Sequence, residues 1–370
     1  MSQYQRNKAM GSCSRPWLFT ACYLLVGDFN LPVSAACVQT FSCSDGFQFS
    51  MVHSPHGMHA KTLATLVLVP CLAAKSLRQV LASHGSLSAL HDMLIRLDLL
   101  ADFEATKNST LLAMTDAAFE YLTNWGMDLG AVDPEIARGV MKYHFFPGVY
   151  ASGDARLKLD GGLIAHSILK PPFLTNVTRG AAVKLLGAGP RDPFRVESGI
   201  QKMLPVVQGD IAHDSGILHT LDENLVLPHS LSETTRLSQH LDGFWTLVQK
   251  AQLTGLLESL QDVTVLLPDN EAVDKVRGRL DSFNDRELKA VIANHVIPNR
   301  VLHLADFAAG DGVKAAALSG LQLHLKHDSE ERLLVNDARV LKADLLVYGG
   351  VVHILDTVLL AEQDGLVVQT

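Results

Sequence analysis

The amino-acid sequence predicts an α+β fold that is built twice in tandem. Blocks of sequence recur in the same order in the two halves of the 370-residue chain. Within each half, apolar residues at helical spacing come first and strand-like alternation follows. A chain of this length is long enough for two domains that each bury a core of their own.

The composition describes a folded protein without a basic surplus. Hydrophobic residues make up 48% of the chain and charged residues 19%, which is typical of globular domains. The net charge is -8, so few cations are left to neutralise phosphates. We therefore expect no nucleic-acid partner.

The cysteines are confined to the start of the chain. All five lie in the first 71 residues, at Cys13, Cys22, Cys37, Cys43 and Cys71. The rest of the chain contains no thiol, which excludes a disulfide framework or a cysteine-ligated zinc site there. The main body must be held together by packing.

Residues 1–75 read as a leader or signal region that is poorly ordered. An apolar stretch, Trp17–Val26, follows basic residues, and a second one, Leu63–Leu72, follows Lys61; both precede small residues, as a signal-peptidase site requires. One chain rarely needs two secretion signals, so the start of translation is expected at Met58 or at Met1. A short buried helix is the other interpretation of the second stretch. Neither stretch reaches the roughly 18 apolar residues of a membrane span, and we expect no transmembrane segment.

Two N-glycosylation acceptor sequences fit passage through the secretory route. They are Asn108-Ser-Thr and Asn176-Val-Thr. We predict a glycan at both asparagines.

Three blocks recur along the chain, and the last is the most specific. "GILHTLDENLVL" from Gly216 aligns with "GVVHILDTVLLA" from Gly350, so that Gly, His, Leu, Asp and Leu coincide. Upstream, "TLLAMTDAAFEYL" matches "TVLLPDNEAVDKV", and "VMKYHFFPGVY" matches "VIANHVIPNRV". A duplicated fold explains such repeats better than two active sites copied together with their cores.

The repeated His and Asp do not form a proton-sharing pair. Side chains alternate between the faces of a strand, so His353 and Asp356 point to opposite faces, as do His219 and Asp222. We interpret all four as structural residues whose polar atoms bond to backbone groups. A partner contact is the alternative.

Helices are predicted early in each half. "SLSALHDMLIRLDLLADF" places leucines at helical spacing behind a serine cap. Asp133 and Pro134 are typical of a cap and a first helical position. Asn284 and Glu287 form a capping-box pattern.

Strands are predicted late in each half. "LQLHLKHD" alternates Leu321, Leu323 and Leu325 with polar residues, and "DLLVYGGVVHIL" predicts a hairpin that turns at Tyr348-Gly349-Gly350. Helices and strands are thus segregated, which favours α+β over alternating βαβ units.

No catalytic motif is present in the sequence. It contains no Gly-x-Ser-x-Gly, His-Glu-x-x-His, Walker loop or paired-glycine dinucleotide fingerprint. His324 and His327 would lie on opposite faces of a strand, which argues against a metal site. We predict a protein that is not an enzyme and has no cofactor and no metal. An enzyme whose site is assembled from distant residues is a remote alternative.

The recurring blocks resemble the fasciclin (FAS1) domain. The resemblance rests on three features. They are the "LAMTDAAF" block, the Tyr143-His144 pair, and the closing block of glycine, apolar residues, histidine and aspartate that follows Asp210-Ile211. The resemblance implies two tandem domains, residues 76–228 and 229–362, followed by a tail, 363–370. Each would be a β-wedge or sandwich with helices packed at one end.

The resemblance also implies which residues matter. The expected partner-binding positions are Tyr143, His144, Asp210, Ile211, His295, Asp344 and Leu345. The expected structural signature consists of Thr115, Asp116, Phe119, His219, Asp222, His353 and Asp356.

The implied function is a secreted interaction protein. Fasciclin-like proteins are associated with cell adhesion and matrix or cell-wall contacts, so the expected partner is a cell-surface or matrix protein or glycan, and the expected location is extracellular or on the cell surface. The alternative is a membrane-anchored protein of the vacuole or the trafficking system. Similarity of fold is weak grounds for choosing between them.

Overall fold

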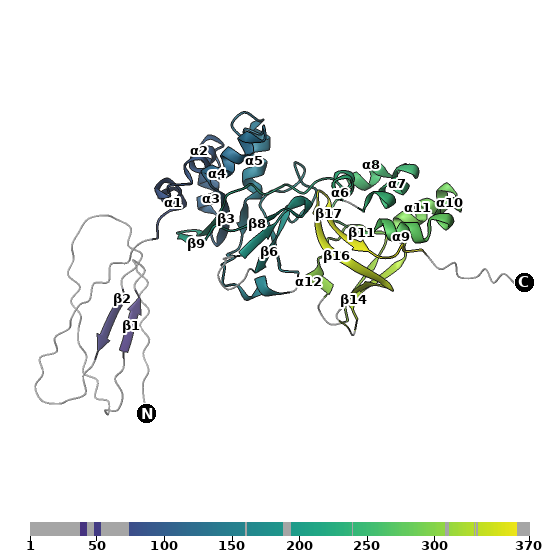
Figure 1. Ribbon diagram of the computed structural model, residues 1–370. Helices are drawn as coiled ribbons and strands as arrows, with labels where there is room; N and C mark the ends of the chain where they lie inside the picture. Colours follow the sequence, from purple (N-terminus) through teal and green to yellow (C-terminus); the bar gives the residue numbers. More distant parts are fainter. Residues whose placement is uncertain are drawn as a thin grey trace, which may run out of the picture. The chain divides into compact units, whose positions relative to one another are not determined.

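The computed structural model describes residues 38–42, 48–52, 74–159, 161–187, 194–238, 240–307, 311–328, 330 and 332–360 (Figure 1). The chain divides into two compact units, Met1–Leu72 and Ala73–Thr370. In the first unit, β1 (Val38–Ser42) pairs antiparallel with β2 (Gln48–Val52). The two signal-like stretches and the C-terminal tail lie outside the described residues.

The second unit contains both copies predicted from the repeats, which we call the first copy (76–228) and the second copy (229–362). These boundaries stay a prediction. Helices precede most strands in each copy, and the α+β prediction is confirmed (Figure 1). The first-copy helices are α1 (Leu77–Ser83), α2 (Ser88–Arg96), α3 (Leu100–Ala105), α4 (Asp116–Asn124) and α5 (Pro134–Tyr143).

The segment "SLSALHDMLIRLDLLADF" differs from its prediction as a helix that begins behind a serine cap. It forms two helices, α2 and α3, because the chain turns at Asp98, whose φ is +56°. The N-cap of α2 is Leu87, which has no side-chain hydrogen bond. The carboxylate of Asp116 in α4 instead accepts from the Ala89 N–H and the Ser88 hydroxyl, both at 2.8 Å. The serine cap was therefore wrong: the cap comes from a distant helix.

Two other predicted helix starts are confirmed. Asp133 accepts from the Glu135 N–H, and Pro134 is the first residue of α5. Asn284 and Glu287 form the capping box of α11 (Asp285–Asn294). Both caps are local in sequence, which is why the sequence could predict them.

The first copy has two four-stranded sheets. Their orders are β4-β3-β10-β9 and β5-β6-β7-β8, and β10 runs parallel to β3. The strands are β3 (Ser109–Met114), β4 (Phe145–Pro147), β5 (Leu163–His166), β6 (Ala182–Gly187), β7 (Phe194–Glu197), β8 (Met203–Pro205), β9 (Gln208–His213) and β10 (Gly216–Leu221).

In the second copy the strands form one seven-stranded sheet of order β12-β11-β17-β16-β15-β14-β13. The long strand β16 (Ala338–Val347) takes part in both arms of this sheet, and β17 (Gly350–Leu355) runs parallel to β11 (Val263–Pro268). The predicted hairpin is confirmed by the pairing of Val347 with Gly350. The other strands are β12 (Val296–Ile297), β13 (Val313–Ala316), β14 (Gln322–His327) and β15 (Leu333–Val335).

The described residues of the second copy form seven helices. They are α6 (Leu231–Leu237), α7 (Asp242–Lys250), α8 (Thr254–Ser259), α9 (Asn270–Lys275), α10 (Arg277–Ser282), α11 and α12 (Leu304–Phe307). Asn270 at the start of α9 accepts from the Gly243 N–H in α7, at 2.8 Å. This bond repeats the contact of Asp116 with α2.

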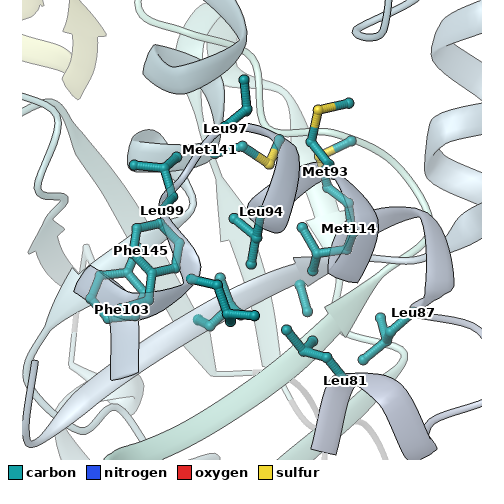
Figure 2. Packing of buried hydrophobic residues seen from close by; sticks show 14 of the residues in the cluster. Leu81, Leu87, Met93, Leu94, Leu97, Leu99, Phe103, Met114, Met141 and Phe145 are labelled. Carbon is teal, nitrogen blue, oxygen red and sulfur yellow. The ribbon is translucent and has the colours of Figure 1, made fainter. Parts of the chain in front are cut away.

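Each copy has two apolar cores that share a central strand. In β3, Leu111 and Ala113 face the helical core, and Leu112 faces the core between the two sheets. Figure 2 shows the helical core, where the rings of Phe103 and Phe145 stack with centroids 4.1 Å apart. In β11, Val265 and Leu267 face the helices and Leu266 the opposite core. A strand buried on both faces is mostly apolar, which explains the long hydrophobic runs.

The glycine of the closing block permits the parallel pairing. A Cβ at Gly216 would lie 2.0 Å from the Ser109 carbonyl oxygen, and one at Gly350 would lie 1.9 Å from that of Val263. No side chain fits at such distances. The repeated glycine is therefore required because the two backbones approach closely, and not because it takes part in a catalytic or binding site.

Candidate functional site

The repeated histidine of the closing block joins three parts of each copy. His353 is fully buried; its Nδ1 accepts from the Asp344 N–H at 3.3 Å, and its Nε2 lies 2.8 Å from the Leu302 carbonyl oxygen. In the first copy, His219 accepts from the Asp210 N–H at 3.1 Å, and its Nε2 lies 3.0 Å from the Tyr150 carbonyl oxygen. With Nδ1 as acceptor, the proton is on Nε2, which donates to the carbonyl. Each ring thus holds a loop against the sheet.

The surroundings keep these two rings neutral. His219 meets the ring of Phe194 edge-on with centroids 4.8 Å apart, and His353 meets Phe307 at 5.3 Å. Burial lowers the pKa of both imidazoles, and nearby carboxylates and carbonyls oppose that effect only in part.

The second repeated histidine follows a helix in each copy. His144 Nδ1 lies 2.8 Å from the Val140 carbonyl oxygen, and its Nε2 accepts from the Leu225 N–H at 3.2 Å. His295 repeats this arrangement with Val291 and Leu359, at 2.7 and 2.9 Å. Burial lowers the pKa of both rings to about 4. These histidines fasten the segment after the closing strand to the end of the helix.

The remaining signature residues also make intramolecular contacts. Asp222 accepts from the Thr115 hydroxyl at 2.8 Å, and Phe119 packs against the helical core. Asp356 accepts from the Arg339 N–H at 2.9 Å rather than from the residue that corresponds to Thr115. The aspartates and histidines of the closing blocks therefore have separate partners.

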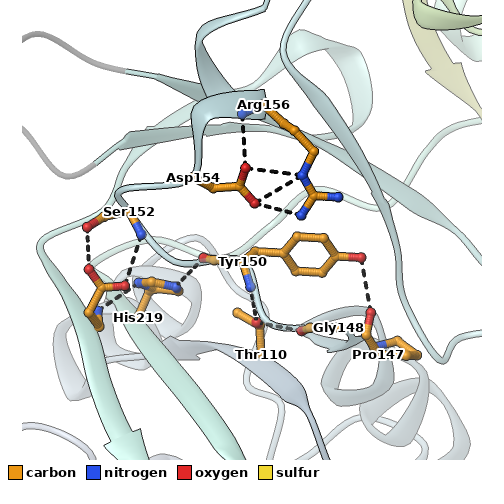
Figure 3. Close-up of polar contacts among 9 residues, drawn as sticks. Thr110, Pro147, Gly148, Tyr150, Ser152, Asp154, Arg156 and His219 are labelled. Carbon is orange, nitrogen blue, oxygen red and sulfur yellow. Dashed lines mark hydrogen bonds and ion pairs between the residues drawn. The ribbon is translucent and has the colours of Figure 1, made fainter.

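Asp210 is an exposed member of this polar network, and its partner Ser152 lies near His219 (Figure 3). It lies at a bulge of β9 with φ +56°, a conformation that Asp tolerates better than most residues. Its exposed carboxylate accepts from the Ser152 N–H at 2.9 Å and from the Ser152 hydroxyl. Burial alone would raise the pKa of Asp210, but the bonds from Ser152 keep it below its usual value.

Asp344 has the same backbone position but a different environment. Its φ is +59°, yet its side chain is 2% exposed. The carboxylate accepts from the Leu304 N–H at 3.0 Å and lies 3.3 Å from His303 Nδ1. Burial opposes ionisation, but the hydrogen bonds from His303 and from the Leu304 N–H hold the pKa of Asp344 below its usual value. The two equivalent aspartates thus adopt the same backbone conformation, but only the carboxylate of Asp210 is accessible to a partner.

Burial corrects the partner-binding prediction for most positions. Five of the seven side chains lie inside the protein and cannot be presented to a partner: Tyr143, His144, His295, Asp344 and Leu345. Asp210 is exposed and Ile211 is half-buried. For these two residues the partner-binding role remains a proposal.

A model of the family described as Fasciclin domain matches residues 85–228 and 239–361. The chain belongs to the fasciclin family. It is 38% identical over 312 residues to "Fasciclin-like arabinogalactan protein CTB11" of Cercospora beticola, which covers 83% of this chain and 82% of that protein. It is 35% identical over 301 residues to "Fasciclin-like arabinogalactan protein elcF" of Phaeosphaeria nodorum, with 81% and 93% covered.

A solved FAS1 domain pair from the insect cell adhesion molecule fasciclin I is also similar. It is 17% identical, with a TM-score of 0.36, and the match covers 76% of this chain and 98% of that one. The family match and the duplicated geometry agree that the chain carries two FAS1 copies.

One predicted glycosylation site of the first FAS1 copy lies at a contact with the second. The Asn176 amide donates to the Ser259 and Leu260 carbonyl oxygens at 3.2 and 3.0 Å. Thr178, the third residue of the acceptor sequence, donates to the Asp262 carboxylate through both its N–H and its hydroxyl. Asn108 is exposed.

We expect glycosylation to distinguish these two asparagines. When the full chain passes through a secretory route, Asn108 should carry an N-glycan and Asn176 should stay unmodified, because a glycan on Asn176 would break its contacts with the second copy. Mass spectrometry of peptides from the folded, secreted protein measures occupancy at each site. Full occupancy at Asn176 in a folded protein would contradict this expectation.

The sequence did not point to an exposed aromatic cluster on the first FAS1 copy. Trp125, the C-cap of α4, is 76% exposed, and Tyr121 one turn earlier is 39% exposed; their ring centroids are 6.0 Å apart. Met127 beside them is 48% exposed. We call these three residues the Trp125 cluster. Their helical spacing was visible in the sequence, but an aromatic pair on a helix is as typical of a core as of a surface.

The described residues contain no group of three or more His, Cys, Asp or Glu side chains placed to hold a metal ion. Within the same residues, no helix is both long and apolar enough to cross a membrane.

Proposed function

We propose that this FAS1 protein is secreted and acts by noncovalent contact with a matrix or cell-wall surface, whose partner is a protein or a glycan. The observation that carries the proposal is the Trp125 cluster. Large aromatic side chains that stay exposed on a folded domain are typical of recognition surfaces, where one Trp can supply much of the binding free energy.

The polar signature supports a binding role over a catalytic one. The four repeated histidines each bond to backbone groups through both ring nitrogens, so none of these four presents a free nitrogen to a substrate. A catalytic base needs access to the proton that it removes. The names of the fungal relatives, fasciclin-like arabinogalactan proteins, also support a binding role.

The two copies differ in their suitability for this contact. The positions that correspond to Tyr121 and Trp125 in the second copy are Lys275 and Arg279. We place the principal contact on the first copy, with the exposed Asp210 as a second candidate point that could meet a cation of the partner.

The test is attachment of the purified full chain to cell-wall or matrix material. Trp125→Ala is expected to weaken attachment by about tenfold or more, the usual loss at a central aromatic contact. The matched control is Leu341→Ala, which removes a 47% exposed apolar side chain from the second copy and should leave attachment unchanged. Asp210→Asn tests whether the Asp210 carboxylate is a second contact with the partner, since asparagine tolerates the same backbone conformation as aspartate.

Pretreating the material with protease or with glycosidase identifies the class of partner. Loss of attachment after one treatment assigns the partner to that class. If wild type and Trp125→Ala attach equally well, the Trp125 cluster is not the contact surface and the proposal fails.

A further inference from the structure

A groove of about 640 Å³ opens on the first copy, away from the Trp125 cluster in sequence. Its walls come from the loop after β4, from β5 and from the two chain segments that follow. The lining includes Tyr150, Ile164, His166, Ile168, Lys170 and Arg179. This volume is within the range of sites for small organic ligands.

Two cations in the lining have no charged partner. Lys170 and Arg179 are exposed, and among the described residues neither forms an ion pair or a side-chain hydrogen bond. The lining contains no acidic residue. The nearby Arg156 differs, because it donates to the Asp154 carboxylate at 2.6 Å (Figure 3). On a chain with a net charge of -8, two unneutralised cations in one concave site favour an anionic ligand.

The backbone around both cations is fixed. The two segments pair, with the Ala181 N–H donating to the Leu169 carbonyl oxygen and the Ser167 N–H donating to that of Ala181, both at 2.9 Å. Gly180 has φ +107°, and a Cβ there would lie 2.1 Å from the Ser167 carbonyl oxygen. Because Thr178 is held by Asp262, Arg179 lies between two constrained residues. The backbone that carries both cations therefore needs no ordering on binding, which lowers part of the entropic cost.

The remaining polar groups of the lining add no opposing charge. The Tyr150 hydroxyl donates to the Pro147 carbonyl oxygen at 3.0 Å, and burial raises its pKa, so the ring is a neutral phenol. His166 Nδ1 donates to the Gly180 carbonyl oxygen at 3.0 Å, and burial lowers the pKa of that imidazole. Tyr150, Ile164 and Ile168 supply apolar surface beside the two cations.

We propose that this groove binds a small organic anion, a carboxylate attached to an apolar ring system. The carboxylate would pair with the guanidinium of Arg179 and the ammonium of Lys170, since arginine matches the planar geometry of a carboxylate. The ring system would lie against Tyr150, Ile164 and Ile168. The proposal is independent of matrix attachment.

The test uses the full chain and 2-naphthoate as the probe, with binding measured by isothermal titration calorimetry. One naphthoate per chain is expected. The double variant Lys170→Gln/Arg179→Gln should bind it about tenfold or more weakly, since charge-assisted hydrogen bonds are lost. Wild type should bind the neutral 2-naphthamide with a similar loss.

The control is Arg286→Gln/Lys289→Gln, which removes two exposed cations of α11 and should leave naphthoate binding unchanged. Circular dichroism checks that each variant is folded. Equal affinity of wild type and Lys170→Gln/Arg179→Gln, equal affinity for the amide and the carboxylate, or no binding at millimolar naphthoate would each overturn the proposal. Trp125→Ala should bind naphthoate normally, so this test and the attachment test fail separately.

Discussion

Replacing His353 with alanine is expected to lower the free energy of unfolding of the second copy by about 3–5 kcal/mol. The imidazole is fully buried and bonds at both nitrogens to backbone groups, the Asp344 N–H and the Leu302 carbonyl oxygen. Alanine leaves both groups buried without partners and removes the contact with Phe307. A catalytic histidine would show the opposite pattern, because replacing it costs activity and little stability.

Urea unfolding followed by tryptophan fluorescence measures this effect. Trp245 is 7% exposed in the second copy and reports on the loss of its core. The control is His229→Ala in the same copy; the His229 ring contacts the Glu233 carboxylate at 3.2 Å near the surface, so a loss of under about 1 kcal/mol is expected. If His353→Ala costs no more than this control, His353 does not hold the fold together.

The sequence predicted the elements whose causes are local. The caps at Asp133 and Asn284 depend on residues within one helical turn, and the hairpin before Gly350 depends on its own turn residues. The opposite faces predicted for His353 and Asp356 are not tested, because Asp356 lies just after the end of β17; the two side chains do have separate partners. The repeat itself indicated two copies, because a duplicated fold preserves its core residues and its close backbone contacts.

The differences between the copies could not be predicted in this way. Asp210 and Asp344 occupy equivalent bulges, and only the loop that meets each carboxylate decides its exposure: Ser152 in the first copy, His303 and Leu304 in the second. The cap of α2 comes from Asp116, 28 residues further along the chain than Ser88. Such contacts depend on tertiary packing, which one sequence does not reveal. The same holds for the groove beside Arg179.

Acid is expected to destabilise both copies through the buried histidines that follow α5 and α11. The pKa of His144 and of His295 is lowered to about 4 by burial, whereas an unfolded histidine titrates near 6.5. The folded state therefore disfavours the proton. Stability from this source is fully present above about pH 6.5 and is lost as the pH falls toward 4.

The expected loss is about 2 kcal/mol per histidine between pH 7.5 and pH 5. Buried His219 and His353 add to it with the same sign, because their pKa values are also lowered. Carboxylates with lowered pKa values, such as Asp344, lose stabilisation only at pH values below about 4. Urea unfolding at several pH values from 7.5 to 5 therefore isolates the histidines.

The variant His295→Gln separates titration from packing. Glutamine places a neutral amide near the position of Nε2, so the variant should be less stable than wild type at pH 7.5 and lose less stability on acidification, a difference visible in the Trp245 signal. In parallel, the His295 ring should keep its neutral NMR chemical shift down to pH 5. A ring that titrates near pH 6.5, or a variant with the same pH dependence as wild type, would mean that His295 is not the buried neutral acceptor of the Leu359 N–H.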